Sequence, residues 1–238
     1  LNVGGHTNKG LPSNNFAELS EFALSAATLV IDLGAIGNST YDLPTLNGPA
    51  DQYDPFGGHD GLNQAKLVQG GPVQIFASGF RNAYDIVYTE TGRFYVWDNG
   101  PNNGWGGTPN NNCTNTIDNG GSKQPDGLHL ISQGYYGGHP NPTRGNKSNT
   151  FGGQSPIEIA ANPIECDYQA PLSGDGALTV NQESTNGMVE YTASNFANSM
   201  KGDLIAAAFG KKLYRVELNG SGTEVTSKSV LDNNVGVI

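Results

Sequence analysis

Two polar corners in one stretch of the chain carry the residues best suited to chemistry. Arg81 stands beside Asn82, and Gly100 and Pro101 form a corner nineteen residues after the arginine, with two short apolar segments between them. Arginine presents a planar fork of hydrogen-bond donors, and a Gly-Pro corner is a common way to leave a strand. The stretch is therefore either a hairpin with polar turns or a cofactor site built from loops at one end of a propeller blade.

Short strand patterns surround these corners along the chain. Each is rich in β-branched or aromatic residues and is bounded by glycine, proline, asparagine or aspartate. The predicted strands span residues 27–33, 72–77, 84–89, 93–98, 127–132, 187–192, 203–209 and 212–218. One short amphipathic helix is predicted over residues 17–27. The fold class that follows is all-β.

A loose repeat of strand, turn and strand indicates a β-propeller. Blades contain up to four short strands and take about 40 residues each. Long turn-rich insertions are predicted near residues 34–71, 99–126 and 133–186, which leaves room for about three to four blades in a single domain over residues 1–238. Because such an arc has exposed edges and the chain opens like the end of a strand, we expect a partial chain from a larger ring.

The charge balance restricts the partners. The 238 residues include 12 basic and 22 acidic side chains, for a net charge of −10. A field of this sign repels phosphate backbones, so nucleic acid is not an expected partner. It is compatible with neutral small molecules such as sugars and with calcium. No apolar run approaches the roughly 20 residues of a membrane helix, so membrane insertion is not expected.

Cysteine usage points to an oxidising compartment. Cys113 and Cys166 are the two cysteines of the chain, and both lie in polar, turn-rich surroundings. An even count in a chain poor in lysine predicts one disulfide and an extracellular or periplasmic location. Two unrelated free thiols are the alternative.

Four motifs carry a resemblance to a known family. They are Ser78 to Asn82, Thr91 to Arg93, Asp98 to Pro101, and an apolar strand with a tyrosine-glycine segment from Leu128 to Pro140. With the glycine turn at Val3 to His6, they cover roughly residues 1–140. This pattern resembles the glucose/sorbosone dehydrogenase family, and most closely a branch of large secreted bacterial proteins. The resemblance implies a six-bladed propeller.

The resemblance also implies sugar oxidation with pyrroloquinoline quinone and Ca²⁺. The family's Arg-Asn pair contacts the quinone, so Arg81 would be catalytic and cofactor-binding by stabilising a developing oxyanion, and Asn82 would bind a cofactor oxygen. Carbonyls of the Gly-Pro corner hold calcium in the family. Gly100 and Pro101 would thus be metal ligands, since Ca²⁺ prefers hard oxygens. The cofactor itself would accept the hydride.

The chain departs from the family where catalysis needs a base. The family's catalytic histidine lies upstream of the glycine turn, and its basic cofactor clamps come from late blades; this sequence contains neither segment. A second hypothesis therefore stands beside the first. It is a non-catalytic extracellular module for surface assembly or for recognition of carbohydrate or protein, with blade edges that pair with the missing blades or with copies of the chain.

Other polar residues allow only general interpretations. Four acids in Gly/Asn-rich loops lack the spacing of a specific calcium loop and are interpreted as solvated turn residues; they are Asp54, Asp60, Asp98 and Asp126. The histidines at positions 6, 59, 129 and 139 show no zinc-type pairing, and His139 is either part of a cavity wall or a loop residue. Trp97 and Trp105 are candidates for stacking on the face of a sugar or cofactor. For Trp97, packing within a blade is the alternative.

Overall fold

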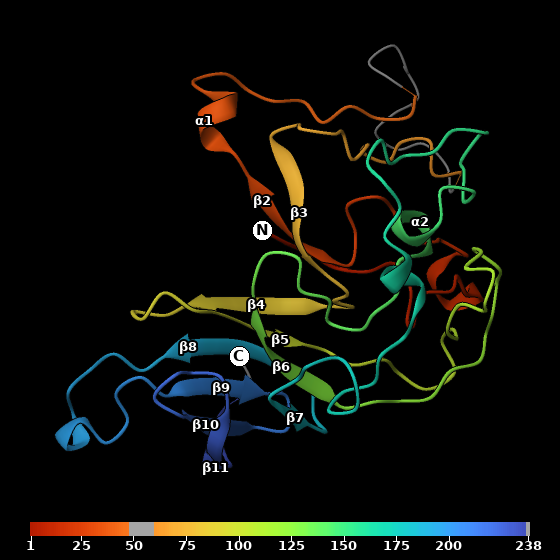
Figure 1. The fold of residues 1–238 in the computed structure, drawn as a ribbon. Helices are drawn as coiled ribbons and strands as arrows, with labels where there is room; N and C mark the ends of the chain where they lie inside the picture. Colours follow the sequence, from red (N-terminus) through yellow and green to blue (C-terminus); the bar gives the residue numbers. More distant parts are fainter. Residues whose placement is uncertain (48–59, 237–238) are drawn as a thin grey trace.

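The computed structural model describes residues 1–47 and 60–236, which form strands and long loops with few helical turns (Figure 1). The strands are β1 (Asn2–Val3), β2 (Ala27–Ile31), β3 (Val73–Ser78), β4 (Ala83–Tyr88), β5 (Phe94–Asp98), β6 (Asp126–Ile131), β7 (Thr179–Asn181), β8 (Thr185–Glu190), β9 (Leu204–Ala208), β10 (Lys212–Leu218) and β11 (Val225–Asp232). The helical segments are α1 (Leu33–Ile36), α2 (Pro142–Gly145), η1 (Asn14–Phe16), η2 (Pro163–Cys166) and η3 (Phe196–Asn198). The predicted all-β class is confirmed.

The strands form three antiparallel sheets that are arranged as successive blades. Their orders are β1-β2-β3, β4-β5-β6-β7 and β11-β10-β9-β8, so that each strand pairs with its neighbour in sequence. The first strands of the sheets adjoin, because Asn2 Nδ2 donates to the Ala83 carbonyl (3.0 Å) and the Met188 N–H donates to Asp85 Oδ2 (2.8 Å). Four-stranded meanders with adjacent first strands are the architecture of a propeller. The predicted partial propeller is therefore confirmed.

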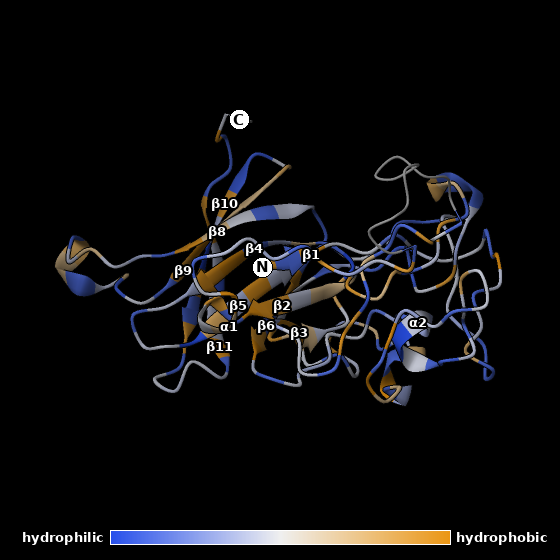
Figure 2. Cartoon of the chain, turned by 90° about the horizontal axis from the view of Figure 1, so that it is seen from above, coloured by the Kyte–Doolittle hydropathy of each residue, from blue (hydrophilic) through white to orange (hydrophobic). Residues whose placement is uncertain are grey.

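Apolar side chains fill the spaces between successive sheets. Trp97 and Leu128 of one sheet meet Met188 and Leu204 of the next. A second cluster, around Phe80, joins β3 to the β4–β7 sheet. In Figure 2 the apolar residues, in orange, are concentrated in the strands. Trp97 is thus buried in blade packing, which confirms that interpretation for this residue.

Two local predictions were wrong. The predicted helix over residues 17–27 does not form, because Ala17 and Glu18 adopt left-handed backbone angles and the Ala23 N–H donates to the side chain of Gln64. The predicted buried strand 27–33 ends at Ile31, and Val30 is 43% exposed. The strands β7 and β11 were not predicted, whereas β1 agrees with the strand end expected at the start of the chain.

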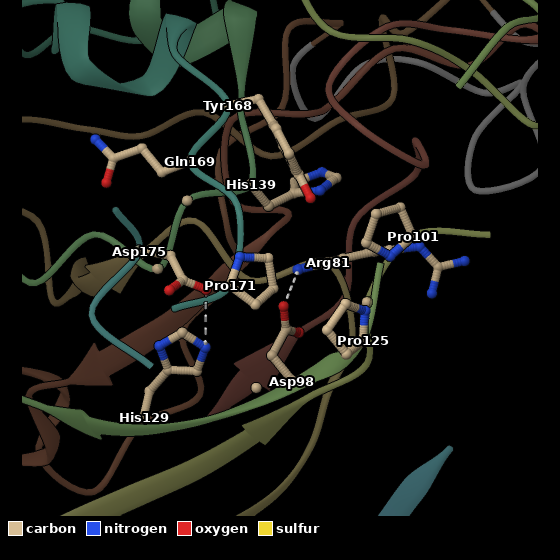
Figure 3. Close-up of a pocket in the computed structure, with 14 residues that line it drawn as sticks. Arg81, Asp98, Pro101, Pro125, His129, His139, Tyr168, Gln169, Pro171 and Asp175 are labelled. Atoms are coloured by element: carbon tan, nitrogen blue, oxygen red, sulfur yellow. Dashed lines mark hydrogen bonds and ion pairs between the residues drawn. The ribbon is translucent and has the colours of Figure 1, made fainter. Parts of the chain in front are cut away.

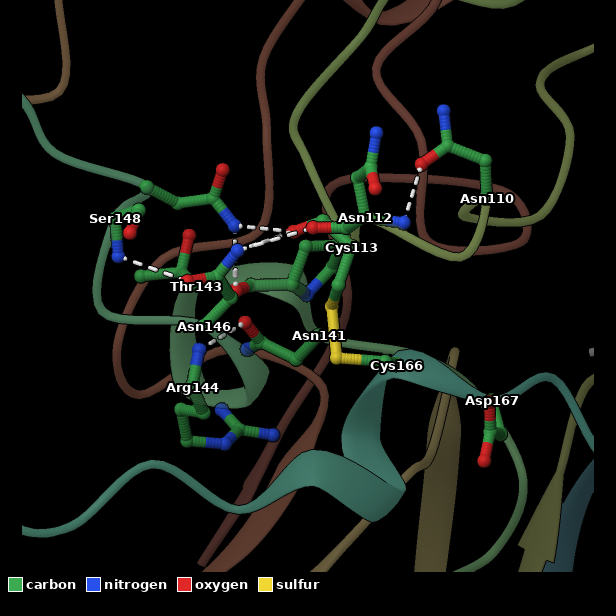
Figure 4. The surroundings of a disulfide bond; sticks show 12 residues. Asn110, Asn112, Cys113, Asn141, Thr143, Arg144, Asn146, Ser148, Cys166 and Asp167 are labelled. Atoms are coloured by element: carbon green, nitrogen blue, oxygen red, sulfur yellow. Dashed lines mark hydrogen bonds between the residues drawn. A yellow bond between two sulfur atoms is a disulfide. The ribbon is translucent and has the colours of Figure 1, made fainter.

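Long connections gather at one end of the sheets, on the right of Figure 1. Cys113 and Cys166 form a disulfide that ties the β5–β6 connection to the β6–β7 connection, as predicted (Figure 4). Beside it, the Arg144 guanidinium pairs with Glu165 at 2.6 Å, and the two side chains are 2% and 3% exposed. Arg144 also donates to carbonyls of the segment before β2, at Ala23, Ser25 and Ala26. The loop end is therefore a tightly bonded layer.

Within the part of the chain that the structure describes, no helix has the length and apolar character needed to cross a bilayer.

Candidate functional site

A small cavity lies at the edge of the β4–β7 sheet that faces these connections (Figure 3). Its polar and titratable side chains include Arg81, Asp98, His129, His139, Tyr168 and Asp175. The cavity has a volume of about 20 Å³. This is room for about one or two water-sized groups.

Arg81 is brought to this cavity by the turn between β3 and β4. Its backbone N–H donates to Asp98 Oδ2 (3.1 Å), and its Nε donates to Asn8 Oδ1 (3.2 Å). Burial lowers the pKa of Arg81, against the opposing charges of nearby acids. In the described residues its terminal amino groups make no hydrogen bond or ion pair. In Figure 3 the guanidinium extends past Pro101, away from His129 and His139.

Asn82, the second residue of the predicted site, does not line the cavity. Its Nδ2 donates to Asn99 Oδ1 (2.9 Å), and its backbone N–H donates to Asp98 Oδ1 (2.7 Å). The Asn99 N–H returns a bond to the Asn82 carbonyl (3.1 Å). The structure thus places this amide in a brace between two loops.

Gly100 and Pro101 line the cavity together with Arg81. The Gly100 N–H donates to Asp126 Oδ1 (2.9 Å), and the Pro101 carbonyl accepts from the Gln124 N–H (3.0 Å). A Cβ at position 100 would lie 2.3 Å from the carbonyl oxygen of Pro125, so only glycine allows this close approach. The corner is held rigidly from both sides.

Calcium at this corner would depend on backbone oxygens. Among residues 1–47 and 60–236, no group of three or more His, Cys, Asp or Glu side chains could hold a metal ion. Gly100, Pro101 and Asp98 line the same cavity, and backbone carbonyls and carboxylates are the hard oxygens that Ca²⁺ prefers. The donor types therefore fit this ion.

The interpretation of Asp98 and Asp126 as solvated turn residues was wrong. They are 8% and 7% exposed, and each carboxylate receives backbone N–H bonds from the loop ends of neighbouring strands. Burial raises the pKa of Asp98 to about 7, although two backbone hydrogen bonds and Arg81 oppose it. Burial also raises the pKa of Asp126. Burial depends on the later connections, so loop composition could not reveal it.

The other acids and histidines of the sequence prediction are not all in the described residues. Asp60 is exposed and accepts the Leu62 N–H at 3.0 Å, which confirms the turn interpretation for this residue. Asp54 and His59 lie outside the described residues.

A buried pair that sequence reasoning missed borders the cavity. Glu21, from the segment predicted as a helix, is fully buried and lies 2.9 Å from Nε2 of His139. His139 lines the cavity, which confirms the cavity-wall interpretation of that residue. The residues are 118 positions apart, so no spacing motif could have paired them.

The aromatic side chains of Tyr168 and Trp105 differ in their position relative to the cavity. Tyr168 lines the cavity, and its hydroxyl is buried without a hydrogen-bond partner among the described residues. The Lys9 ammonium lies 4.6 Å from the centre of the Tyr168 ring. Trp105 is exposed and contacts Phe16 edge to face, and it does not line the cavity. Tyr168 is thus the aromatic side chain that the cavity offers to a ligand.

Solved structures of sugar dehydrogenases are similar to this chain at low sequence identity. A glucose dehydrogenase crystal structure is 17% identical, with a TM-score of 0.48, over 97% of this chain and 50% of that chain. A second glucose dehydrogenase gives 17% identity and a TM-score of 0.40, over 78% of this chain and 40% of that one.

A third similar structure is the soluble aldose sugar dehydrogenase from Escherichia coli in the apo-form, at 15% identity and a TM-score of 0.39. It is matched over 69% of this chain and 39% of that one. The chain therefore spans half or less of the length of these sugar dehydrogenases. No family model and no curated protein matches the chain.

Proposed function

We propose that this chain belongs to a quinoprotein sugar (aldose) dehydrogenase-like protein, which oxidises a sugar with pyrroloquinoline quinone and calcium. The observation that carries the proposal is the meeting of Arg81, Gly100 and Pro101 on one cavity. The sequence resemblance assigned these residues to the cofactor and the ion. The disulfide agrees with a secreted, extracellular or periplasmic setting.

The residues fit the proposed groups in chemistry. The free amino groups of Arg81 would donate to a quinone oxygen, and the carbonyls of Gly100 and Pro101 would bind calcium. The enclosed space admits one or two small groups, so a ring system as large as the quinone would be held mainly by residues outside this cavity. When bound, that cofactor supplies the hydride acceptor.

A non-catalytic propeller module is the second candidate, and internal bonding at the site favours it. The Asn82 amide is bound to Asn99, and the Pro101 carbonyl is bound to Gln124. Apolar residues are also exposed on strands at the two ends of the arc of sheets, at Val30 of β2 and at Val230 of β11. These strands would meet other blades or copies of the chain, for surface assembly or recognition.

Calorimetric titration of pyrroloquinoline quinone into the full-length protein, with and without Ca²⁺, separates the two candidates. Arg81→Ala removes the free donors, and Arg93→Ala is the matched control, because Arg93 lies at the opposite end of the β4–β5 hairpin. Calcium-dependent binding that is weakened roughly tenfold or more in R81A, and is unchanged in R93A, is expected. Absence of binding at high cofactor concentration would contradict the enzyme and leave the recognition module.

A further inference from the structure

Two histidines, His129 and His139, line the same cavity with opposite kinds of partner. His139 Nε2 lies 2.9 Å from Glu21 Oε1 and 3.3 Å from the Thr7 hydroxyl. The backbone N–H of His139 donates to the Gly79 carbonyl (2.9 Å), which fixes the position of the residue. Its ring is therefore held from the side away from the cavity.

The Glu21 carboxylate is saturated with donors. Besides His139 it accepts bonds from the His6 N–H (3.0 Å), the Thr7 N–H (2.9 Å), the Thr7 hydroxyl (2.6 Å) and the Ser25 hydroxyl (2.5 Å). Burial would raise the pKa of Glu21, but the hydrogen bond and charge of His139, with His6 and Ser25, bring it to about 2. An ionised carboxylate can only accept hydrogen bonds.

This arrangement determines the tautomer of His139. Because Glu21 only accepts, Nε2 must carry the hydrogen, and Nδ1 of the neutral ring is left with a lone pair. Nδ1 makes no hydrogen bond within the described residues, while the ring lines the cavity. In its neutral form, the ring thus presents an acceptor nitrogen backed by the buried Glu21 carboxylate.

His129 has the opposite arrangement. The Tyr135 hydroxyl donates to the Asp175 carbonyl (2.6 Å), so it accepts from His129 Nδ1 at 2.9 Å. The remaining nitrogen, Nε2, is 3.8 Å from Asp175 Oδ2, beyond hydrogen-bond range. Burial lowers the pKa of His129 to about 4. His129 is therefore a weak base whose remaining nitrogen lies beside a carboxylate.

The cavity also provides a donor. The buried Tyr168 hydroxyl has no hydrogen-bond partner in the described chain, and Tyr168 lines the cavity together with His139. A ligand hydroxyl is both donor and acceptor, and the space of about 20 Å³ suits a group of that size. Gly5 lies between the Arg81 turn and Glu21. Its N–H donates to the Arg81 carbonyl (2.7 Å), and a Cβ at this position would lie 2.8 Å from Glu21 Oε1.

We propose that His139, oriented by Glu21, accepts the hydrogen bond of a ligand hydroxyl in this cavity, with the buried Tyr168 hydroxyl as the second polar group. The ligand class is a neutral polyol such as a sugar, and that class rests on the function proposed above. His139 binds the ligand directly, and Glu21 is the positioning residue.

Nitrogen NMR of the histidine rings in the full-length protein tests the tautomer without any variant or ligand. The expected result is a neutral His139 ring that is protonated at Nε2 and bare at Nδ1. Glu21→Gln, whose amide can donate as well as accept, should allow the other tautomer to appear. A wild-type ring with hydrogen on Nδ1 overturns the proposal.

D-glucose, added with Ca²⁺ and without quinone, tests the ligand. We expect the Nδ1 signal of His139 to shift, and His139→Gln to weaken glucose binding roughly tenfold. Arg93→Ala, at the opposite end of the β4–β5 hairpin, is the control and should change binding less than about twofold. An unmoved His139 signal at high glucose, or equal affinity in H139Q, overturns the inference. The quinone titration judges the proposed function separately, so the two failures are distinguishable.

Discussion

The two four-stranded sheets share one topology but differ in the length of their connections and in the burial of their polar side chains. The β4–β7 sheet has connections of residues 99–125 and 132–178, whereas the β8–β11 sheet joins β9 to β10 through residues 209–211 and β10 to β11 through residues 219–224. The cavity, with its buried acids and histidines, lies at the β4–β7 sheet. The β8–β11 sheet carries ion pairs nearer the surface, such as that of Arg215 with Asp203. A blade thus gains a site through its connections, because only long loops can bury polar groups with partners.

The largest contrast is expected between the ion pairs of the two regions. Arg144→Ala leaves Glu165 as an uncompensated buried charge and frees three carbonyls, so we expect a loss of about 3–5 kcal/mol in the free energy of unfolding. Arg215→Ala breaks a pair whose side chains are 21% and 13% exposed, with an expected loss of about 1 kcal/mol. Urea unfolding of the full-length protein measures both. Equal losses would contradict the contrast.

A smaller contrast is expected between glycines in the two sheets. Gly100→Ala forces a Cβ against two backbone carbonyls, and overpacking of this kind costs about 2–3 kcal/mol. Gly220→Ala, in the β10–β11 turn, meets nothing within 4 Å and should change stability by less than about 0.5 kcal/mol. Thermal unfolding at neutral pH compares the two. An unchanged midpoint in G100A would show that the corner can relax.

The smallest effect expected is a pH dependence from His129. The unfolded chain binds a proton at this histidine below its ordinary pKa of 6.5, whereas the folded protein binds it only near 4, so stability falls as the pH is lowered through this window. Between pH 7 and pH 5 the loss from this group is about 2 kcal/mol. His129→Gln should remove that part of the loss in urea unfolding at the two pH values. An identical loss in H129Q would show that other groups cause the acid sensitivity.

Other titrating groups also make the stability of the protein depend on pH, so the contribution of His129 has to be isolated with a variant. The raised pKa of Asp98, about 7, means that the folded state holds a proton there which the unfolded state releases above its ordinary pKa of 3.8. Its contribution therefore falls as the pH rises from 3.8 to 7, opposite in sign to that of His129. Glu21, with a pKa of about 2, loses its contribution only below pH 4.5. The difference between wild type and H129Q isolates one group.

The local sequence pattern by itself predicted most of the strands. Alternation of apolar residues, bounded by turn residues, is a property of a few neighbouring positions, so β4, β5, β6 and β10 were predicted nearly at their observed bounds. The family resemblance, and not the local pattern, singled out Arg81, Gly100 and Pro101 as one group, and the β4–β5 hairpin brings these residues to one cavity.

The tertiary structure alone decided the rest. Asp98 and Asp126 became buried because distant loops cover them, and a polar loop composition does not record what packs above it. The segment around Glu21 has an amphipathic pattern, yet its backbone groups bond to residues such as Gln64 and Thr143 and no helix forms. Glu21 and His139 meet across 118 residues through packing of loops, and long-range pairing of this kind leaves no periodic signal in the sequence.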